Sequence, residues 1–253
     1  MMTARFHLPD LGANALEGDE AKHCAQVLRK HVGDQIIVFD SAGNEATAEI
    51  TAISTKQVDL KILERRETPA PAVSISLIQA IPKGANMEWI IEKAVELGVN
   101  DIYPVVTERT VVRLDLRDCA RKQEKWQRVA LETCKQCGQN WLPKVHAPSR
   151  FPAMLGALPG HDLKIIAALQ PDAKSVRDVL QSAIPNLQSA VVAIGPEGDF
   201  TSDEYAAARA HGLVPVTLGP LVLRVETAAF FAVSVLVHEL RGEERIYKPD
   251  GIN

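Results

Sequence analysis

The feature that most constrains this chain is a regular alternation of apolar runs and helical patterns after residue 73. Buried strands are predicted at VSISLIQAI, DIYPVV, DLKIIAAL, SAVVAIG and LVPVTLG. Between the first two, apolar residues recur at helical spacing, namely Met87, Ile90, Ile91, Ala94 and Leu97. A basic helix is expected over 118–136, and a last helix over 226–240 is apolar enough to be buried. This alternation predicts an α/β domain whose mostly parallel sheet is covered on both faces.

A linker near residues 64–73 divides the chain. Its sequence ERRETPAPAV combines charges with prolines, which favour extended backbone and stop helices. Before it, the β-rich runs QIIVFD, EATAEITAIS and QVDLKILE are separated by turn residues, and one short helix is expected around 20–30. These runs are typical of a small β-barrel or sandwich. We therefore predict two domains, 1–70 and 73–253.

Charge is distributed unevenly along the chain. The formal net charge of −4 argues against a generic nucleic-acid binder. Residues 107–150, however, hold 10 Lys and Arg against 5 Asp and Glu, an excess of +5. This basic stretch can meet RNA phosphates, and a solvated helix face is the alternative interpretation.

Several other classes of protein are not favoured. The sequence has no apolar run of roughly 18 residues, as a membrane span needs, and no apolar signal segment at its N-terminus. We expect a cytoplasmic protein with reduced cysteines. Cys134 and Cys137 have CxxC spacing, but no further paired ligands complete a zinc site. They are interpreted as helix cysteines, and no metal is predicted.

Two glycine-containing turns follow predicted strands, AIGPEGDFTSDE at 193–204 and LGPLVLRVETAAF at 218–230. In open parallel sheets, ligands bind beyond the carboxyl ends of the strands. Neither turn has the pattern of a P-loop or of a dinucleotide site, and the Glu197 carboxylate would repel a phosphate. A cationic or zwitterionic ligand fits better. Arg224 and Glu226 are expected just before the last helix, with Thr227 able to cap it.

These turns carry a resemblance to a known family. IGPEGDFTSDE followed by LGPLVLRVETAA resembles the paired signature of the SPOUT methyltransferases, specifically the RsmE family. IPKGANMEWIIEKAVELGV at 81–99 and the N-terminal HCAQVLRKHVGDQIIVFD resemble further blocks of that family, in the right order. The motifs together cover nearly the whole chain.

The resemblance implies a PUA-like β-barrel that helps to grip RNA, followed by a SPOUT α/β domain with a trefoil knot. It also implies a homodimer that binds S-adenosylmethionine among the knot loops and methylates N3 of a uracil in small-subunit (16S) ribosomal RNA. The implied cofactor residues are Leu169, Gly195, Pro196, Glu197, Leu218, Gly219, Leu223, Arg224, Thr227 and Ala228. The expected RNA-binding residues are His23, Arg29, Lys83, Arg113, Arg117 and Lys135.

The reaction makes two chemical demands. The uracil N3 proton must leave, and negative charge that develops on O2 and O4 must be stabilised. Arg224 is the catalytic candidate for stabilising that charge. For the proton, either Arg224 lowers the pKa of the base or a carboxylate accepts the proton, Glu226 being the nearest in sequence. We place the action of Arg224 first. His211 is expected at the surface.

Three departures from the family pattern stand out. Asp199 replaces a glycine of GPEGG, Leu221 replaces the arginine of LGxRILR, and Gln139 stands where an arginine is usual. Because the basic patch is modest, we expect assembled small subunits to be the substrate. Two alternatives remain at this point: a SPOUT enzyme that methylates the ribose 2′-hydroxyl, and a non-catalytic RNA-binding factor with the same fold.

Overall fold

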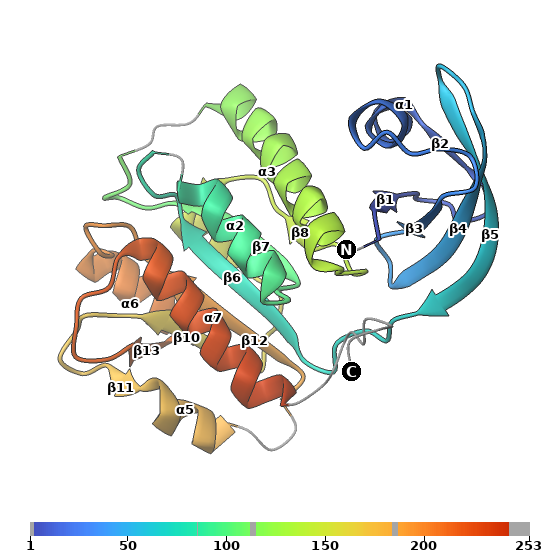
Figure 1. Ribbon diagram of the computed structural model, residues 1–253. Coiled ribbons are helices and arrows are strands. Elements are labelled where there is room, and N and C mark those ends of the chain that lie inside the picture. The colour runs from blue at the N-terminus through green and yellow to red at the C-terminus, as the bar shows by residue number, and fades with distance from the viewer. Residues whose placement is uncertain (1–2, 85, 112–114, 184–186, 243–253) are drawn as a thin grey trace. The chain divides into compact units, whose positions relative to one another are not determined.

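The computed structural model describes residues 3–84, 86–111, 115–183 and 187–242 (Figure 1). Within them the chain forms two compact units. The first comprises residues up to Ala70 together with Leu131–Leu142, and the second comprises Pro71–Ala130 and the residues from Pro143 onward. A short later segment, residues 131–142, thus belongs to the same unit as the residues up to 70.

The first unit is built around a five-stranded sheet of order β1-β3-β4-β5-β2. Its strands are β1 (Arg5–His7), β2 (Ala15–Glu17), β3 (Gln35–Phe39), β4 (Asn44–Ile53) and β5 (Gln57–Glu67). Only the β1–β3 pair is parallel. Alternate residues of β4, Ala46, Ala48 and Ile50, are fully buried, as a half-buried strand requires. Two register shifts in β4 interrupt its ladder with β5.

The helix expected around 20–30 differs from the prediction. It consists of α1 (Gly18–Lys22) and a π-helical turn at His23–Val27. The amide of Leu28 donates to the His23 carbonyl, and Arg29 then adopts a left-handed backbone with φ of 51°. The helix therefore ends before residue 29, because a residue with a β-carbon in this conformation cannot continue it.

Residues 131–142 are fixed in the first unit by a buried polar cluster. The Arg5 guanidinium pairs with Glu45 at 2.8 Å and donates to the Asn140 side-chain oxygen. The Trp141 indole donates to the Thr68 carbonyl at 2.9 Å. Both terminal nitrogens of Arg5, the Asn140 amide and the Trp141 indole are hydrogen-bonded, which limits the cost of burying them, and the buried Arg5 Nε atom has no partner among the described residues.

The second unit contains a sheet in which all pairs between described strands are parallel. Its order is β11-β13-β10-β12-β6-β7-β8, and β9 also pairs with β7. The strands are β6 (Ser74–Ala80), β7 (Asp101–Val106), β8 (Lys144–Val145), β9 (Ser149–Arg150), β10 (Leu163–Ala167), β11 (Lys174–Ser175), β12 (Ser189–Ile194) and β13 (Val214–Thr217). The predicted long strands and their parallel arrangement are confirmed.

Helices cover both faces of this sheet. The helices after β6 are α2 (Asn86–Glu96), α3 (Leu116–Cys137), whose last residues belong to the first unit, α4 (Phe151–Ala157), α5 (Val176–Ala183), α6 (Ser202–Ala210) and α7 (Val225–Arg241). Helices α2 and α7 pack together, α7 against β6 and β12, and lie over the same face in Figure 1. Residues of α4 and α6 join the core of the other face.

The expectation that the last helix is buried is only half right. Val225, Ala229, Ala232, Val233 and Leu236 of α7 are buried. Phe231 is 43% exposed in the single chain. The helix thus has one face against the sheet and another that keeps a large apolar side chain in contact with water.

Candidate functional site

A pocket lies beyond the carboxyl ends of β10, β12 and β13, where loops of an open parallel sheet diverge. Residues 218–224 lead from β13, on the far side of β10, to α7, which packs on β12 and β6. This connection therefore crosses the ends of two strands, and the resemblance places the knot here. The cavity has a volume of about 450 Å³, within the range of small-molecule sites.

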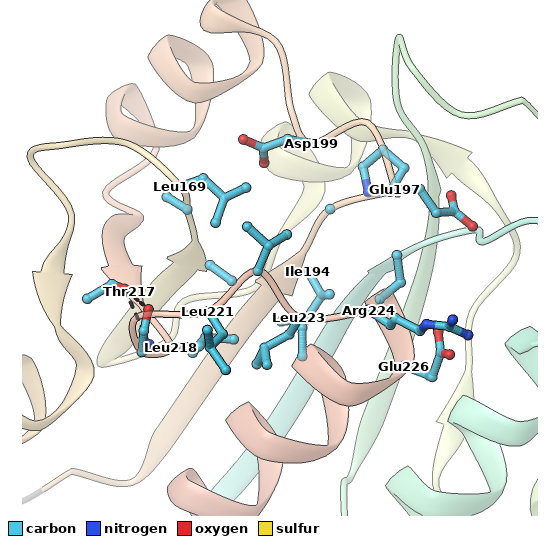
Figure 2. A pocket seen from close by; sticks show the side chains of 18 of the residues that line it. Leu169, Ile194, Glu197, Asp199, Thr217, Leu218, Leu221, Leu223, Arg224 and Glu226 are labelled. Carbon is cyan, nitrogen blue, oxygen red and sulfur yellow. Dashed lines mark hydrogen bonds between the residues drawn. The ribbon is translucent and has the colours of Figure 1, made fainter.

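The pocket brings together almost all of the expected cofactor residues (Figure 2). Those that line it are Leu169, Gly195, Pro196, Glu197, Leu218, Gly219, Leu223, Arg224 and Ala228. Thr227 is not among the lining residues. It is also not the helix cap, because Arg224 occupies the N-cap position of α7 and Thr227 lies inside the first turn. The expected role of Thr227 as a cap is therefore wrong.

The loop after β12 is held from two neighbouring loops. The Lys83 amide donates to the Glu197 carboxylate at 3.0 Å, and the Arg109 guanidinium donates to the Gly198 carbonyl at 2.6 Å. The loop ends in a capping box in which Thr201 and Glu204 bond reciprocally. Glu204 also accepts a bond from the Glu108 amide at 2.9 Å. These bonds fix the backbone that forms one wall of the pocket.

Helix α6 supports the loops after β10 and β12 together. The buried Tyr205 hydroxyl donates to Asp199 at 2.6 Å and lies 3.3 Å from the Ala167 carbonyl. Arg209 donates to Gln170 at 2.7 Å and pairs with Asp172 at 2.8 Å. Burial, with the bond to Asp199 adding to it, raises the pKa of Tyr205 far above its usual range. Tyr205 therefore remains a hydrogen-bond donor at every physiological pH.

The opposite wall is the connection from β13 to α7. Gly219 has φ of 127°, a conformation that L-residues with a β-carbon rarely adopt. Its amide donates to the Thr217 hydroxyl at 3.3 Å. Arg224 and Glu226 come from the N-terminal end of α7 and lie at the same end of the pocket in Figure 2. The guanidinium and carboxylate needed by the predicted chemistry therefore line one cavity.

The expected RNA-binding residues have different surroundings. Arg29, Lys83 and Arg117 are exposed, and His23 is half-buried against Phe6. Arg113 lies outside the described residues.

Lys135, in contrast, has only 8% of its side chain exposed and pairs with Glu20 and with Glu132. Burial alone would lower the pKa of Lys135, but its bonds to the two carboxylates raise it. The structure therefore gives Lys135 an internal role in place of the RNA contact that we expected.

The three departures from the family pattern also have defined places. Leu221 lines the pocket and is 74% exposed. Asp199 lines the pocket in a left-handed conformation. Gln139 accepts a hydrogen bond from the Trp141 amide at 3.2 Å, so it contributes to the turn that joins residues 131–142 to the first unit.

The described cysteine, histidine and acidic residues do not form a metal site. In the described ranges no group of three or more His, Cys, Asp or Glu side chains is placed to hold a metal. Cys134 and Cys137 lie in α3, and burial raises the pKa of the Cys134 thiol. No helix among the described residues is long and apolar enough to cross a membrane.

Several pocket residues were not predicted from the sequence. Asn86, Ile194, Thr217 and Val222 also line the cavity. Ile194 and Thr217 are the last residues of β12 and β13, so the rule that ligands bind at the carboxyl ends of strands could have found them. Asn86 starts α2, and only the tertiary structure brings it to this site.

Comparisons with known proteins agree with this geometry. The family model described as an RNA methyltransferase domain matches residues 68–237, and that described as an RNA methyltransferase PUA domain matches residues 16–63. Ribosomal RNA small subunit methyltransferase E of Bacillus subtilis is 32% identical over 241 residues, covering 91% of this chain and 93% of the relative. The protein of that name from Synechocystis is 34% identical over 213 residues, 83% of this chain and 67% of the relative.

A solved structure gives the same result. The crystal structure of ribosomal RNA small subunit methyltransferase E from Neisseria gonorrhoeae, bound to S-adenosyl methionine, has a TM-score of 0.84 and 30% identity, and the match covers 94% of this chain and 98% of that one. The predicted PUA-like domain and SPOUT domain are confirmed. Because the methyltransferase domain model matches more than half of the chain and the relatives span nearly all of it, the protein belongs to the ribosomal RNA small subunit methyltransferase E family.

Proposed function

We propose that this protein transfers a methyl group from S-adenosylmethionine to N3 of a uracil in small-subunit ribosomal RNA. The observation that carries the proposal is the position of Arg224. It lines the pocket at the N-terminus of α7, beside Glu226 and at the end away from Leu169 in Figure 2. A relative whose structure contains S-adenosyl methionine shares this fold along nearly its whole length.

The lining suits such a cofactor. Leu169, Ile194, Leu218 and Leu223 provide apolar surface for an adenine ring. Backbone groups in the turns after β12 and β13 can hydrogen-bond the edge of the ring without a matching charge. Glu197, Asp199 and Glu226 against the single lining cation Arg224 give this cavity, as far as the chain is described, an excess of negative charge. That excess suits a ligand with a net positive charge.

Two side chains of the protein, Arg224 and Glu226, are proposed to act on the substrate base. When bound, S-adenosylmethionine supplies an electrophilic methyl group on its sulfonium. The Arg224 guanidinium is always charged, and we propose that it stabilises negative charge on O2 or O4 as the N3 proton leaves. Glu226, in the first turn of the same helix, is the carboxylate that we propose to accept that proton or to orient Arg224. We assign the main effect to Arg224.

For the RNA substrate, we propose contacts with the exposed Arg29, Lys83 and Arg117, with His23, and with Arg113. Phosphate contacts of this kind position an RNA without reading its sequence. The set is small, so shape must contribute to recognition. We therefore propose that the assembled small subunit is the substrate, in the cytoplasm. Equal rates of methylation on subunits and on a short RNA hairpin would contradict this.

We also propose that the protein is a homodimer. Trp89 of α2 is 47% exposed and meets Phe230 of α7 edge-on, with ring centroids 5.0 Å apart. Phe231 is exposed on the same helix. Neighbouring exposed aromatic residues are typical of a surface that another protein covers. A second copy is the partner that the resemblance implies.

The test of the methyl-transfer proposal is Arg224→Ala, compared with Arg224→Lys. We expect Arg224→Ala to lower the single-turnover rate by roughly 100-fold or more, as loss of a charge-stabilising group does. Binding of S-adenosylmethionine, measured by calorimetry, should change much less. Arg224→Lys keeps the charge and should retain part of the rate. A wild-type rate in Arg224→Ala would contradict the assignment.

A further inference from the structure

Asn86 presents an exposed polar side chain to the pocket. It is the first residue of α2 and lines the cavity. In the part of the chain that the structure describes, its carboxamide forms no hydrogen bond. The next residue, Met87, is buried, so the start of the helix is anchored in the core. The amide nitrogen of Asn86 can therefore donate to a ligand in the cavity.

Helices α2 and α7 begin at the same edge of the sheet. Helix α2 connects β6 to the parallel strand β7, so it runs back from the carboxyl ends of the strands. Helix α7 starts at the pocket, and its last residue, Arg241, donates to the carbonyls of Val73 and Gly98 at 2.9 and 2.7 Å. Val73 precedes β6 and Gly98 precedes β7, at the opposite edge. The two helices therefore run in the same direction, side by side (Figure 1).

One aromatic contact shows how the two helices are aligned. The rings of Trp89 in α2 and Phe230 in α7 meet with centroids 5.0 Å apart. Asn86 lies three residues before Trp89, and Glu226 lies four residues before Phe230. Residues at these spacings share one face of a helix and are about one turn, roughly 5 Å, apart along its axis. Asn86 and Glu226 thus stand at the same level, on the faces by which the helices meet.

A hydrogen bond from the preceding loop gives the same placement. The Lys83 amide donates to the Glu197 carboxylate at 3.0 Å. Figure 2 shows Glu197 with Arg224 and Glu226 at one end of the cavity. Because Lys83 is three residues before Asn86, the start of α2 is held at this end. Asn86 therefore belongs to the part of the pocket that we assign to the reacting base.

The proposed reaction places negative charge on both sides of N3. When the N3 proton leaves, to a carboxylate or to water, the charge is shared by O2 and O4, which flank N3. The N3 electron pair forms the bond to the methyl carbon in the plane of the ring, while the carbon–sulfur bond breaks and leaves its electron pair on sulfur. A cation directly in front of N3 would block this approach. One guanidinium thus serves one of the two oxygens, and the other requires its own donor.

We propose that the Asn86 carboxamide donates a hydrogen bond to the uracil oxygen that Arg224 does not contact. The inference rests on the proposed function and assigns a second catalytic residue to it. A hydrogen bond to the anionic form of a group lowers the pKa of that group, so Asn86 makes the N3 proton easier to remove. Neither side chain replaces the other, because the two oxygens lie on opposite sides of N3.

The experiment measures single-turnover methylation of small subunits from cells that lack the gene, with saturating S-adenosylmethionine. Asn86→Ala removes the donor and should lower the rate by roughly 100-fold. Asn86→Asp has nearly the same shape but places a carboxylate against the anionic base, so it should lower the rate further. Asn86→Gln keeps an amide donor and should retain part of the rate.

The pH dependence separates this role from a general loss of structure. Without Asn86 the pKa of the bound base is higher, so the rate of Asn86→Ala should keep increasing to higher pH. The ratio of the wild-type rate to the variant rate should therefore be largest at neutral pH and fall as the pH rises. The charged groups on the elements around Asn86 are the same in both proteins, namely Lys83, Glu88, Lys125, Glu197, Arg224 and Glu226.

Stability and cofactor affinity provide the controls. An acidic residue in the first turn of a helix interacts favourably with the helix dipole, so Asn86→Asp should unfold at the wild-type temperature or above it while being the slowest variant. The Kd for S-adenosylmethionine, measured by calorimetry, should change little in Asn86→Ala. Gln181→Ala removes an exposed amide of α5 that does not line the pocket and should leave the rate unchanged.

Three results would overturn the inference. They are a wild-type rate in Asn86→Asp, a rate ratio for Asn86→Ala that does not change with pH, and a loss of S-adenosylmethionine affinity in Asn86→Ala as large as the loss of rate. The last result would place Asn86 against the methyl donor. If the wild-type protein forms no N3-methyluridine, the proposed function fails instead, so the two failures are distinguishable.

Discussion

Leu221 stands in the pocket where the resemblance predicts an arginine, and its side chain is 74% exposed. A large apolar side chain in contact with water adds nothing to the attraction of phosphate. Arg224, three residues later, keeps its charge in the same cavity. The chain therefore retains the group that we assign to the reacting base and has no cation at position 221 to contact the RNA.

Leu221→Arg should restore that cation. We expect affinity for small subunits to rise a few-fold at low salt, and the slope of log affinity against log salt to steepen by about 0.7–0.9 for one added phosphate contact. Binding titrations at several salt concentrations measure both quantities, and Leu221→Gln is the uncharged control. If the slopes of the two variants are the same, Leu221 does not face the RNA.

Several pocket residues that belong to a sequence motif were predicted correctly as lining residues. Gly195, Pro196 and Glu197 lie in a turn whose position depends on local chemistry and on the end of β12. Thr227 and Lys135 were misplaced for a different reason. Whether a residue caps a helix or is buried in ion pairs depends on where the helix begins and on which side chains from distant parts of the chain surround it.

The loop after β7 holds the neighbouring loop after β12 in place. Arg109 donates to the carbonyl of Gly198 and lies 3.5 Å from that of Phe200. A β-carbon added at Gly198 would come within 3.4 Å of the Arg109 side chain. The two loops are thus packed closely, and the arginine orders the backbone of the cofactor wall without lining the pocket itself.

Arg109→Ala should loosen that wall. Loss of an exposed charge-assisted hydrogen bond is worth about 1 kcal/mol, so we expect roughly a fivefold increase in the Kd for S-adenosylmethionine. Arg121→Ala is the matched control, since Arg121 is exposed and pairs with Asp118 one turn away in α3. Wild-type affinity in Arg109→Ala, or an equal loss in Arg121→Ala, would show that the Arg109 hydrogen bond to the loop after β12 does not support binding of S-adenosylmethionine.

The long elements followed from sequence periodicity, and the short ones did not. Helix α2 was predicted because its apolar residues recur at helical spacing, and β6, β10 and β12 because they are continuous apolar runs. Strands such as β8 and β9 have two residues each, so no periodicity can reveal them. They form because a neighbouring strand offers free backbone groups.

Contacts between residues far apart in the sequence decide which unit residues 131–142 belong to. Residues 131–142 join the first unit through Asn140 and Trp141. At Gly43, φ is 97° and a β-carbon would come within 2.5 Å of the Trp141 ring. The sequence separates these residues by about a hundred positions, so the predicted domain limits could not include this segment.

The proposed dimer can be tested through α7. Phe231→Lys should shift the protein from dimer towards monomer in sedimentation equilibrium, because it places a charge in an apolar contact. Leu63→Lys is the control, since Leu63 is also 43% exposed but lies in β5. A wild-type protein that is monomeric at every concentration would contradict the dimer, and an unchanged dimer in Phe231→Lys would exclude this surface.

We propose that the enzyme formed around this pocket methylates N3 of a uracil in the small-subunit RNA. The most direct measurement is mass-spectrometric mapping of 16S ribosomal RNA from cells that lack the gene and are complemented with either wild type or Arg224→Ala. We predict that N3-methyluridine disappears at one site, returns with the wild type and does not return with the variant. Loss of a ribose 2′-O-methyl group instead, or full restoration by Arg224→Ala, would contradict the account.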